Sequence, residues 1–438
     1  MKRVLAVIAC MISFNAHALD WQTEFLEAAS QAIEEAASQA VETLRQSGVD
    51  INAPNDLGQT ILYRVVAQGY SSLANELIKQ GADVNRALTD AVVWDNPDAV
   101  EFLLQYEIDG NYIVNAEGYG RNYPLVLLAN QKSFEYATLL LDKGADINTV
   151  GGPTGETLLI QAIRQFDIAK AKTLLQRGAD INLASQQGFT PLYYAWLGRQ
   201  MRDAEAGKRL FDFLLANKAD PNGVTPYVLE NRDLDTLKVL IEHGADTSYQ
   251  LDNAKSLLMS ATENAYNDIA RYLIDNGADL DAQDSGGNTA LMLAIANDNQ
   301  ELARRLLERQ ADVNPINRFG NNALMMAANI GATDLVGRIL SNKPAINLRG
   351  QYAATALSLA VFRGHSETVG LLLQANADPN LPIVDGRTPL ILAVQNKDIE
   401  GVKLLLEAGA DSSIHDNTGK SALDHAAESP EILELLST

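Results

Sequence analysis

The sequence predicts an all-α solenoid of about 12–13 helix-turn-helix units with projecting turns, curved and elongated. The first observation is a recurring phrase, Gly-Ala-Asp-hydrophobic-Asn, found at residues 81–85, 144–148 and 178–182. Looser copies bring the number of these anchors to twelve, and six of the eleven intervals between them are 33 residues long. The second observation is that helix-like apolar runs lie between the anchors. A fixed period of this size indicates stacked units, each of which needs neighbours to bury its apolar face.

The first helix of each unit begins at a Thr or Ser followed by a small residue or Pro and then Leu. This pattern starts at Thr190, Thr355, Thr388 and Ser421. The hydroxyl can accept a hydrogen bond from an unpaired backbone N–H of the first turn, and Pro fits that turn. An apolar run, such as residues 292–296, then continues the helix.

A second helix follows a polar break and ends at the next anchor. In residues 301–310, Leu302, Leu306 and Leu307 fall on one helical face. The Gly of the anchor closes this helix, because Gly enters the left-handed conformation without a side-chain clash. Each unit is therefore a helical hairpin plus a projecting turn, which we call the finger.

These phrases resemble the ankyrin-repeat family, whose units run Asp-x-x-Gly-x-Thr-Pro-Leu-His, helix, helix, Gly-Ala-Asp-x-Asn. The resemblance covers about residues 24–438. In the family the His helps to bridge neighbouring turns by hydrogen bonds. At that position this chain has Tyr63, Ile160, Tyr193, Met259, Met292, Met325, Ser358, Ile391 and Asp424. We therefore expect mostly apolar packing in place of the bridge.

The first 18 residues differ from the rest of the chain. They combine a basic start, apolar residues 4–14 and the small residues Ala16 and Ala18. This pattern is typical of a bacterial secretory signal cleaved before Leu19, and it predicts a periplasmic mature protein. Two alternatives remain, an N-terminal helix that is not removed and a lipid anchor on Cys10.

The predicted organisation is a single array with a cap at each end. Residues 1–18 are the cleaved signal, 19–52 an N-terminal capping hairpin, 53–413 the ankyrin-repeat array and 414–438 a C-terminal capping hairpin. Terminal units need a polar outer face because nothing stacks on them. Beyond the signal, the sequence has no apolar stretch long enough to cross a bilayer.

Cysteine and charge restrict the chemistry of the mature chain. Cys10 is the only cysteine and lies in the signal, so the mature chain has no disulfide and no thiol nucleophile. Without the signal, 32 basic residues stand against 56 acidic ones, a net charge of −24. This acidity disfavours nucleic acid and anionic membranes as partners. It suits a basic protein partner or serves solubility alone.

Catalytic motifs are scarce. The histidines of the mature chain are His243, His365, His415 and His425, and no two lie four residues apart as a helical metal site requires. The sequence has no nucleophile elbow and no phosphate loop. The many Asp residues recur at the repeat period, which is typical of turn and cap formers. We expect no enzyme activity, no metal and no cofactor.

Irregular repeats are the predicted binding region. Two intervals of 26 residues indicate missing fingers, with helices expected to begin near Leu88 and Thr225. Intervals of 37 and 40 residues add a longer finger and a longer connection between helices. Ten of the fourteen tyrosines also lie between Trp94 and Tyr266. Because Tyr, Trp and Arg often anchor interfaces, we predict that the partner contacts Trp94, Tyr112, Tyr119, Arg121, Tyr123, Tyr194, Trp196, Arg199, Arg202 and Tyr227.

Three functions remain open. The resemblance favours a monomeric periplasmic scaffold that binds a folded protein through its concave face and fingers. A narrower form is an immunity or inhibitor protein that neutralises a toxin enzyme in the periplasm. The alternative of another class is an unrecognised enzyme or a small-ligand binder. The aromatic and arginine residues of this region also have purely structural explanations. Tyr136, Tyr193 and Trp94 would be packed inside the protein, and residues 199–209 would form a solvated loop.

Overall fold

The computed structural model describes residues 41–42, 46, 48–116, 120–152, 154–200 and 204–437, with backbone alone at 115, 116 and 120–124. The predicted signal and most of the N-terminal hairpin lie outside these residues. The chain divides into two compact units, Met1–Gly223 and Val224–Thr438, which we describe separately.

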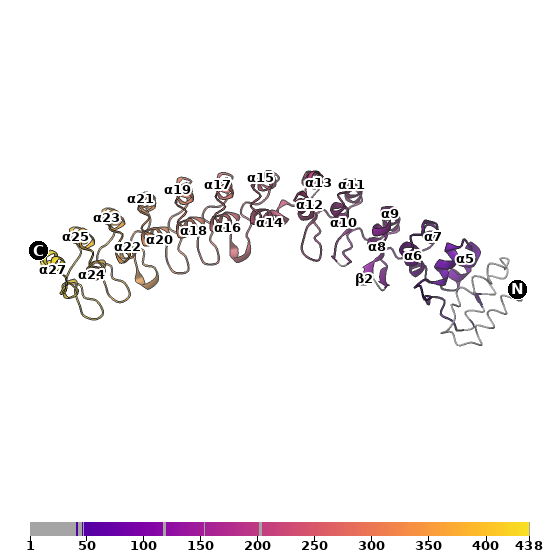
Figure 1. Cartoon of the computed structure of the whole chain (residues 1–438), viewed down its shortest axis with the longest axis horizontal. Coiled ribbons are helices and arrows are strands. Elements are labelled where there is room, and N and C mark those ends of the chain that lie inside the picture. The colour runs from indigo at the N-terminus through magenta and orange to yellow at the C-terminus, as the bar shows by residue number, and fades with distance from the viewer. Residues whose placement is uncertain are drawn as a thin grey trace. The chain divides into compact units, whose positions relative to one another are not determined.

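In the first unit, inner and outer helices alternate along the chain in two rows, and the fingers extend on the side of the inner row (Figure 1). The inner helices are α4 (Ile61–Ala67), α6 (Val84–Val93), α8 (Leu125–Lys132), α10 (Leu158–Arg164) and α12 (Pro191–Arg199). The outer helices are α5 (Ser71–Lys79), α7 (Pro97–Leu103), α9 (Phe134–Asp142), α11 (Ile168–Gln176) and α13 (Ala204–Ala216). A short 3-10 helix, η1 (Pro221–Gly223), ends the unit.

The second unit repeats this arrangement more regularly. Its inner helices are α14 (Thr225–Glu230), α16 (Leu257–Glu263), α18 (Ala290–Ala296), α20 (Ala323–Ile330), α22 (Ala356–Arg363), α24 (Pro389–Gln395) and α26 (Ala422–His425). Its outer helices are α15 (Leu234–Glu242), α17 (Asn267–Asp275), α19 (Gln300–Glu308), α21 (Thr333–Ser341), α23 (Ser366–Gln374), α25 (Ile399–Glu407) and α27 (Pro430–Ser437). Two fingers contain the 3-10 turns η2 (Asp252–Ala254) and η3 (Gln351–Ala353).

The helix starts predicted at Thr190, Thr355, Thr388 and Ser421 are confirmed. The hydroxyl of Thr190 accepts a hydrogen bond from the Tyr193 N–H at 3.3 Å, and Thr388 caps α24 in the same way at 3.3 Å. Thr355 and Ser421 also cap the helices that follow them. Each cap satisfies one N–H that has no partner inside the helix.

The anchor residues connect neighbouring repeats. Within an anchor, the carboxylate of Asp146 accepts the Asn148 N–H at 2.9 Å. The side chain of Asn148 then accepts the backbone N–H of Asp180, the corresponding residue one repeat later, at 2.8 Å. The anchor Gly178 has φ +93°, as the predicted helix end requires. The anchors therefore build the fold, and their recurrence carries little information about function.

Apolar packing replaces the family's bridging His at most positions, as predicted. Ile160, Met259 and Met325 are fully buried there. Two polar residues behave differently, because Ser358 and Asp424 accept the N–H of the cap residues Thr355 and Ser421 and complete capping boxes.

The irregular intervals differ in two ways from the prediction. Helix α6 begins at Val84 and not near Leu88, because the anchor Asp83 itself caps the helix by accepting the Arg86 N–H at 3.0 Å. The longer finger of the 37-residue interval forms a two-stranded antiparallel ribbon, β1 (Ile113–Ala116) and β2 (Gly120–Pro124), in an otherwise helical fold. Val114 pairs with Tyr123 in its register.

The inner and outer helices of the 40-residue interval approach closely through two glycines. A Cβ on Gly207 of α13 would lie 2.5 Å from the Arg199 nitrogen and from the Gly198 carbonyl carbon. Both atoms belong to the backbone, so neither can move without shifting α12. By contrast, a Cβ on Gly337 of α21 would have no neighbour within 4 Å.

We expect Gly207→Ala to destabilise the first unit by about 1–2 kcal/mol, because overpacking costs more than the gain in helix propensity. Gly337→Ala should leave the second unit as stable or raise its stability by up to about 1 kcal/mol. The midpoint of urea unfolding, followed by circular dichroism on the full chain, measures both changes. Equal midpoints for the two variants would contradict the packing described for α12 and α13.

Candidate functional site

The structure describes only part of the predicted contact set. Tyr119 and Arg202 lie outside the described residues, and for Arg121 and Tyr123 only the backbone of β2 is described. The prediction that these four side chains contact a partner therefore stays a prediction. The other six predicted residues have described positions.

Tyr112 is half-buried beside the helix that lacks a finger. Burial raises the pKa of its hydroxyl, and the nearest charges are those of Asp83, Arg86 and Asp90. All three belong to α6 or to its cap. Tyr112 thus packs at the start of α6, where other repeats have a finger.

Trp94 is the C-cap of α6, at the helix end away from the missing finger. Its side chain is 47% exposed, so it does not fill that space and is available to a partner. Tyr227 lies half-buried on α14 in the second unit.

Two predicted contact residues are occupied by internal packing. Trp196 is only 3% exposed and packs with Tyr193, so the prediction that it contacts a partner is wrong. The guanidinium of Arg199 lies over the ring of Phe211 at 4.8 Å, an arrangement that favours a structural role. The Phe189 ring stacks on the Tyr193 ring, with 4.3 Å between their centroids, so the aromatic residues of this repeat mostly pack against one another.

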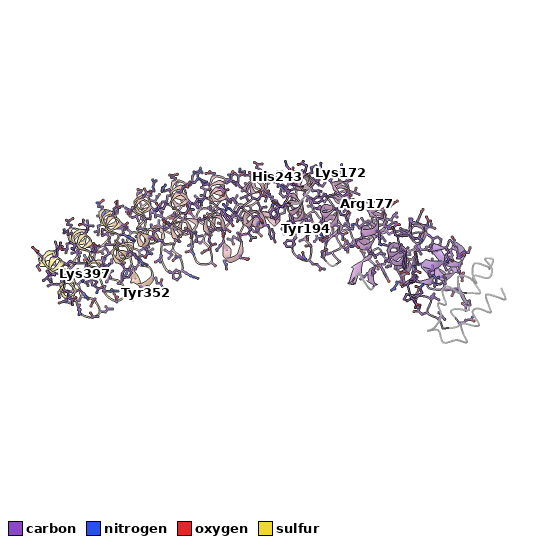
Figure 2. The ribbon with its side chains drawn as sticks, viewed as in Figure 1. Lys172, Arg177, Tyr194, His243, Tyr352 and Lys397 are labelled. Carbon is purple, nitrogen blue, oxygen red and sulfur yellow. The ribbon has the colours of Figure 1, made fainter. Side chains whose placement is uncertain are left out.

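Tyr194 packs edge-on against Phe189 and Tyr193, with ring centroids 6.2 and 5.7 Å away, and it also lines a groove on the finger side of the first unit. The groove has two adjoining hollows of about 420 and 300 Å³. Thr154, Glu156 and Arg164 border both hollows. Figure 2 places Tyr194 on the side of the inner helices and Lys172 on the side of the outer helices. Of the predicted contact residues with described side chains, only Tyr194 borders these hollows.

The groove is built at a corner between fingers and helices. The finger before α10 closes with a bridge between Gly151 and Glu156, and the next finger is joined to it because Gln186 N donates to Gly155 O at 2.9 Å. Helix α8 contributes Gln131 and α12 contributes Tyr194. Three successive repeats therefore form one continuous wall.

This wall combines hydrogen-bonding groups with the apolar residues Ile163, Phe166 and Leu197 of the second hollow. Its glutamines are Gln131, Gln161, Gln165 and Gln187. Arg164 Nη1 donates to Glu156 Oε1 at 2.5 Å, and Glu156 is buried while half of the Arg164 side chain is exposed. The ion pair thus holds the guanidinium at the surface of the groove. Amides that both donate and accept suit a polar, adaptable contact.

Sequence reasoning named only Tyr194 of this groove, because it followed the aromatic and arginine residues of the 37- and 40-residue repeats, whereas most of the lining comes from the nearly regular 34-residue repeat between them. A signal was nevertheless present. The residue just before each helix cap and the residue seven positions after the cap both differ from repeat to repeat. Three such pairs bond across the corner, Glu156 with Arg164, Lys255 with Glu263, and Arg387 with Gln395.

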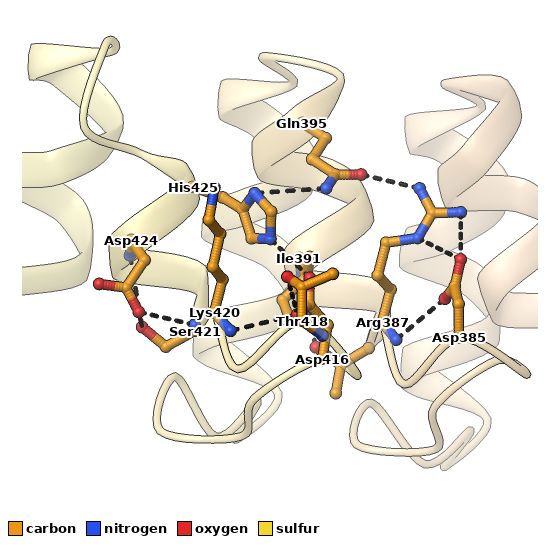
Figure 3. A network of polar contacts seen from close by, with 11 residues as sticks. Asp385, Arg387, Ile391, Gln395, Asp416, Thr418, Lys420, Ser421, Asp424 and His425 are labelled. Carbon is orange, nitrogen blue, oxygen red and sulfur yellow. Dashed lines mark hydrogen bonds and ion pairs between the residues drawn. The ribbon is translucent and has the colours of Figure 1, made fainter.

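The second unit contains a chain of polar contacts near its last fingers (Figure 3). Arg387 pairs with Asp385 and donates to Gln395 at 2.8 Å. At the other end, His425 Nε2 contacts the carboxylate of Asp416 at 2.8 Å. Hydrogen bonds from the Thr418 hydroxyl and from His425 hold the pKa of Asp416 well below its ordinary value.

This network fits a structural clasp better than a catalytic site. Nδ1 of His425 contacts Gln395 at 3.4 Å and Nε2 contacts Asp416, so both ring nitrogens are engaged. The nearby Thr418 hydroxyl donates to Asp416 and does not face the imidazole as a nucleophile would. The arrangement fixes the last finger against α24 and α26.

Within the described part of the chain, no group of three or more His, Cys, Asp or Glu residues is placed to hold a metal ion. No helix of that part is both long and apolar enough to cross a bilayer.

Comparisons with known proteins agree with this architecture. A family model described as ankyrin repeats (3 copies) matches residues 28–114, 125–223, 200–284, 226–317, 311–383 and 376–438. The nuclear factor NF-kappa-B p105 subunit of Gallus gallus is 30% identical over 154 residues, which cover 33% of this chain and 16% of that protein. Human ankyrin repeat and SOCS box protein 16 is 28% identical over 218 residues, 47% of each chain.

A bacterial relative and a solved structure are also similar. Protein PhlB of Serratia liquefaciens is 29% identical over 157 residues, 34% of this chain and 67% of that protein. The crystal structure of the human ASB11 ankyrin repeat domain matches with 25% identity and a TM-score of 0.41, over 49% of this chain and 96% of that one. The chain spans less than half the length of the first two relatives named above.

Proposed function

The chain belongs to the ankyrin-repeat family, and from this premise we propose that it is a non-catalytic scaffold that binds a folded protein in the bacterial periplasm. Ankyrin repeats typically mediate protein–protein interaction. The scaffold would use the finger side of its inner helices, where successive repeats present variable residues on a rigid stack.

The groove of the first unit is the observation that carries this proposal. It spans three repeats, and its exposed amides, guanidinium and Tyr194 offer hydrogen bonds along with an aromatic anchor. Polar groups line most of the first hollow, while Ile163, Phe166 and Leu197 give the second hollow a mostly apolar lining, a mixture that is typical of protein interfaces. The extent of the groove across three repeats supports a protein partner.

Export is the second part of the proposal. The N-terminal sequence pattern supports cleavage before Leu19, and the absence of cysteine after residue 18 suits an oxidising compartment. We expect N-terminal sequencing of the protein from a periplasmic fraction to begin at Leu19. A chain that begins at Met1, or one that carries a lipid on Cys10, would contradict this part and leave the binding proposal intact.

The large net negative charge favours a narrower version, an immunity or inhibitor protein that neutralises a basic toxin enzyme. Acidity speeds the association of oppositely charged partners and makes it sensitive to salt. The identity of the captured partner separates this version from a general scaffold.

Affinity purification of the mature chain from periplasmic extract, followed by mass spectrometry, tests the proposal. We expect one protein to be recovered in an amount close to that of the bait. A control bait of similar charge but different fold should not recover this protein. Recovery of the bait with no associated protein, or with a small molecule only, would contradict a protein-binding role.

A further inference from the structure

Exposed apolar side chains are concentrated in one stretch of the second unit. Of the thirteen large apolar residues that are exposed in the described chain, six lie between residues 316 and 384. They are Ile316, Phe319, Ile330, Tyr352, Phe362 and Val384, which we call the apolar patch. Tyr352, Phe362 and Val384 are 68%, 53% and 64% exposed. Exposed apolar side chains that cluster in this way mark interaction sites.

The repeats that carry the patch are bonded to their neighbours. Val384 N donates to Tyr352 O at 2.8 Å, which joins two finger tips. Gly320 and Gly350 are in close contact, since a Cβ on Gly320 would lie 3.2 Å from the Gly350 Cα. Figure 2 shows Tyr352 on the finger side of this unit. At the helix ends, Arg363 Nε donates to the Asn329 side chain at 3.1 Å and joins α22 to α20.

Phe362 occupies a position that is polar in several other repeats. Arg164, Glu263 and Gln395 stand at this position, and each bonds to the finger residue eight positions before it. The pair in this repeat is Ala354 and Phe362, so no polar bridge covers the corner. The ring of Phe362 is instead left in solvent, which costs free energy unless a partner covers it.

The finger that carries Tyr352 is held in an unfavourable backbone conformation. Tyr352 and Ala353 have φ +57° and +56°, values that side-chain-bearing residues rarely adopt. Asn253 and Ala254 of the η2 finger have the same conformation, with φ +61° and +58°, so it belongs to this type of finger. Here it places a Tyr ring at the tip, where a Gly would be conformationally easier.

Three arginines lie in the repeats that carry the patch, although the protein is strongly acidic overall. Arg318 lies over the Phe319 ring at 4.8 Å and Arg363 over the Phe362 ring at 5.7 Å. Arg349 donates to the Pro382 carbonyl at 2.6 Å. Among the described residues, none of these three arginines forms an ion pair with a carboxylate. Asp385 is the acidic residue of the neighbouring finger, and Arg387 neutralises it at 2.7 Å.

We propose that the apolar patch is a second binding surface, and that it takes an acidic polypeptide segment with interspersed apolar side chains. Aliphatic Ile316, Ile330 and Val384 match apolar side chains better than stacked bases. The net charge of −22 also opposes a dense polyanion such as nucleic acid. The three arginines without carboxylate partners supply the charge complementarity for Asp and Glu.

Panning a phage library of random 12-residue peptides on the immobilised full chain from Leu19 tests the preference. The selected peptides should be rich in Asp and Glu placed among Leu, Ile or Phe. Enrichment of basic peptides, or no enrichment, would overturn the proposal. Tighter binding of a single-stranded oligothymidylate than of the selected peptide would overturn it as well.

Fluorescence anisotropy with a selected, labelled peptide locates the site. Tyr352→Ser with Phe362→Ser should lower the affinity about tenfold or more. Arg318→Ala with Arg363→Ala should lower it about three- to tenfold and remove much of its salt dependence. The control, Ile168→Ser with Lys172→Ala on α11, removes one exposed apolar and one exposed basic residue of the first unit and should leave affinity within about twofold.

Unchanged affinity in both patch variants would refute the proposed site. The altered side chains are largely exposed, so circular dichroism and the unfolding midpoint should stay at their wild-type values. Because the patch lies in the second unit, substitutions in the groove of the first unit should not affect peptide binding. Failure of this inference and failure of the scaffold proposal are thus distinguishable.

Discussion

Replacing Gln165, Gln187 and Tyr194 together by Ala should lower the affinity for the captured partner by about tenfold to a hundredfold, equivalent to about 1.4–2.7 kcal/mol. These side chains line the two hollows of the groove, and Tyr194 is the aromatic anchor among them. We expect most of the loss in the dissociation rate, because the change removes short-range contacts and no charge. Isothermal titration calorimetry measures the affinity, and surface plasmon resonance measures the dissociation rate.

The matched control removes polar surface from the same repeats on the opposite side. Lys172 and Gln176 are exposed on the outer helix α11, so Lys172→Ala with Gln176→Ala should leave partner affinity unchanged. Arg164 is unsuitable for this test, because its removal would leave the buried Glu156 carboxylate without its partner and disturb folding. Equal losses in the groove and control variants would show that the partner does not use the groove.

The second large effect concerns Asp90, a buried carboxylate on the helix that has no finger before it. Asp90 on α6 is buried, and one of its oxygens accepts both the backbone N–H and the hydroxyl of Thr60 at 2.7 Å. Thr60 in turn caps α4. Asp90→Ala should destabilise the first unit by about 2–4 kcal/mol, because it leaves buried donors unpaired. Urea unfolding measures the loss, and Glu101→Ala, at an exposed position of α7, is its neutral control.

The amide variant Asp90→Asn isolates the contribution of charge. Burial raises the pKa of Asp90 above its ordinary value of 3.8. A raised pKa means that the folded state favours the protonated form, so this stabilisation is present below pH 3.8 and is lost as pH rises through the folded pKa. Asp90→Asn does not titrate. Its stability relative to the wild type should therefore increase as pH rises from about 4 toward 7. A difference independent of pH would contradict the account of Asp90.

Local sequence predicted most of the fold because each repeat carries its own signals. Thr190 and Thr388 mark helix starts because each hydroxyl accepts a hydrogen bond from the backbone N–H three residues later. Gly178 marks a helix end through its own backbone conformation. The start of α6 was missed where one residue has two roles, since Asp83 is both the anchor of one unit and the cap of the next helix. The β1–β2 ribbon was missed because its segment carried only an insertion signal.

The site was harder to predict, because exposure depends on which face of each helix stacks. Trp196 and Arg199 have the residue types of an interface, yet one packs on Tyr193 and the other on Phe211. The groove and Phe362 of the apolar patch instead use positions at the corner between finger and helix, which are bonded to each other in some repeats. That pairing joins residues eight positions apart and becomes visible only when the fold places them together, as for Glu156 with Arg164.

Hydrogen–deuterium exchange with mass spectrometry, on the full chain alone and saturated with its captured partner, tests the central claim most directly. The groove of the first unit should be the partner's footprint, so amide exchange should slow in residues 151–165 and 187–198. The outer helix α11 should exchange at the same rate in both samples. Protection confined to the outer helices, or to regions that exclude both groove segments, would contradict the account.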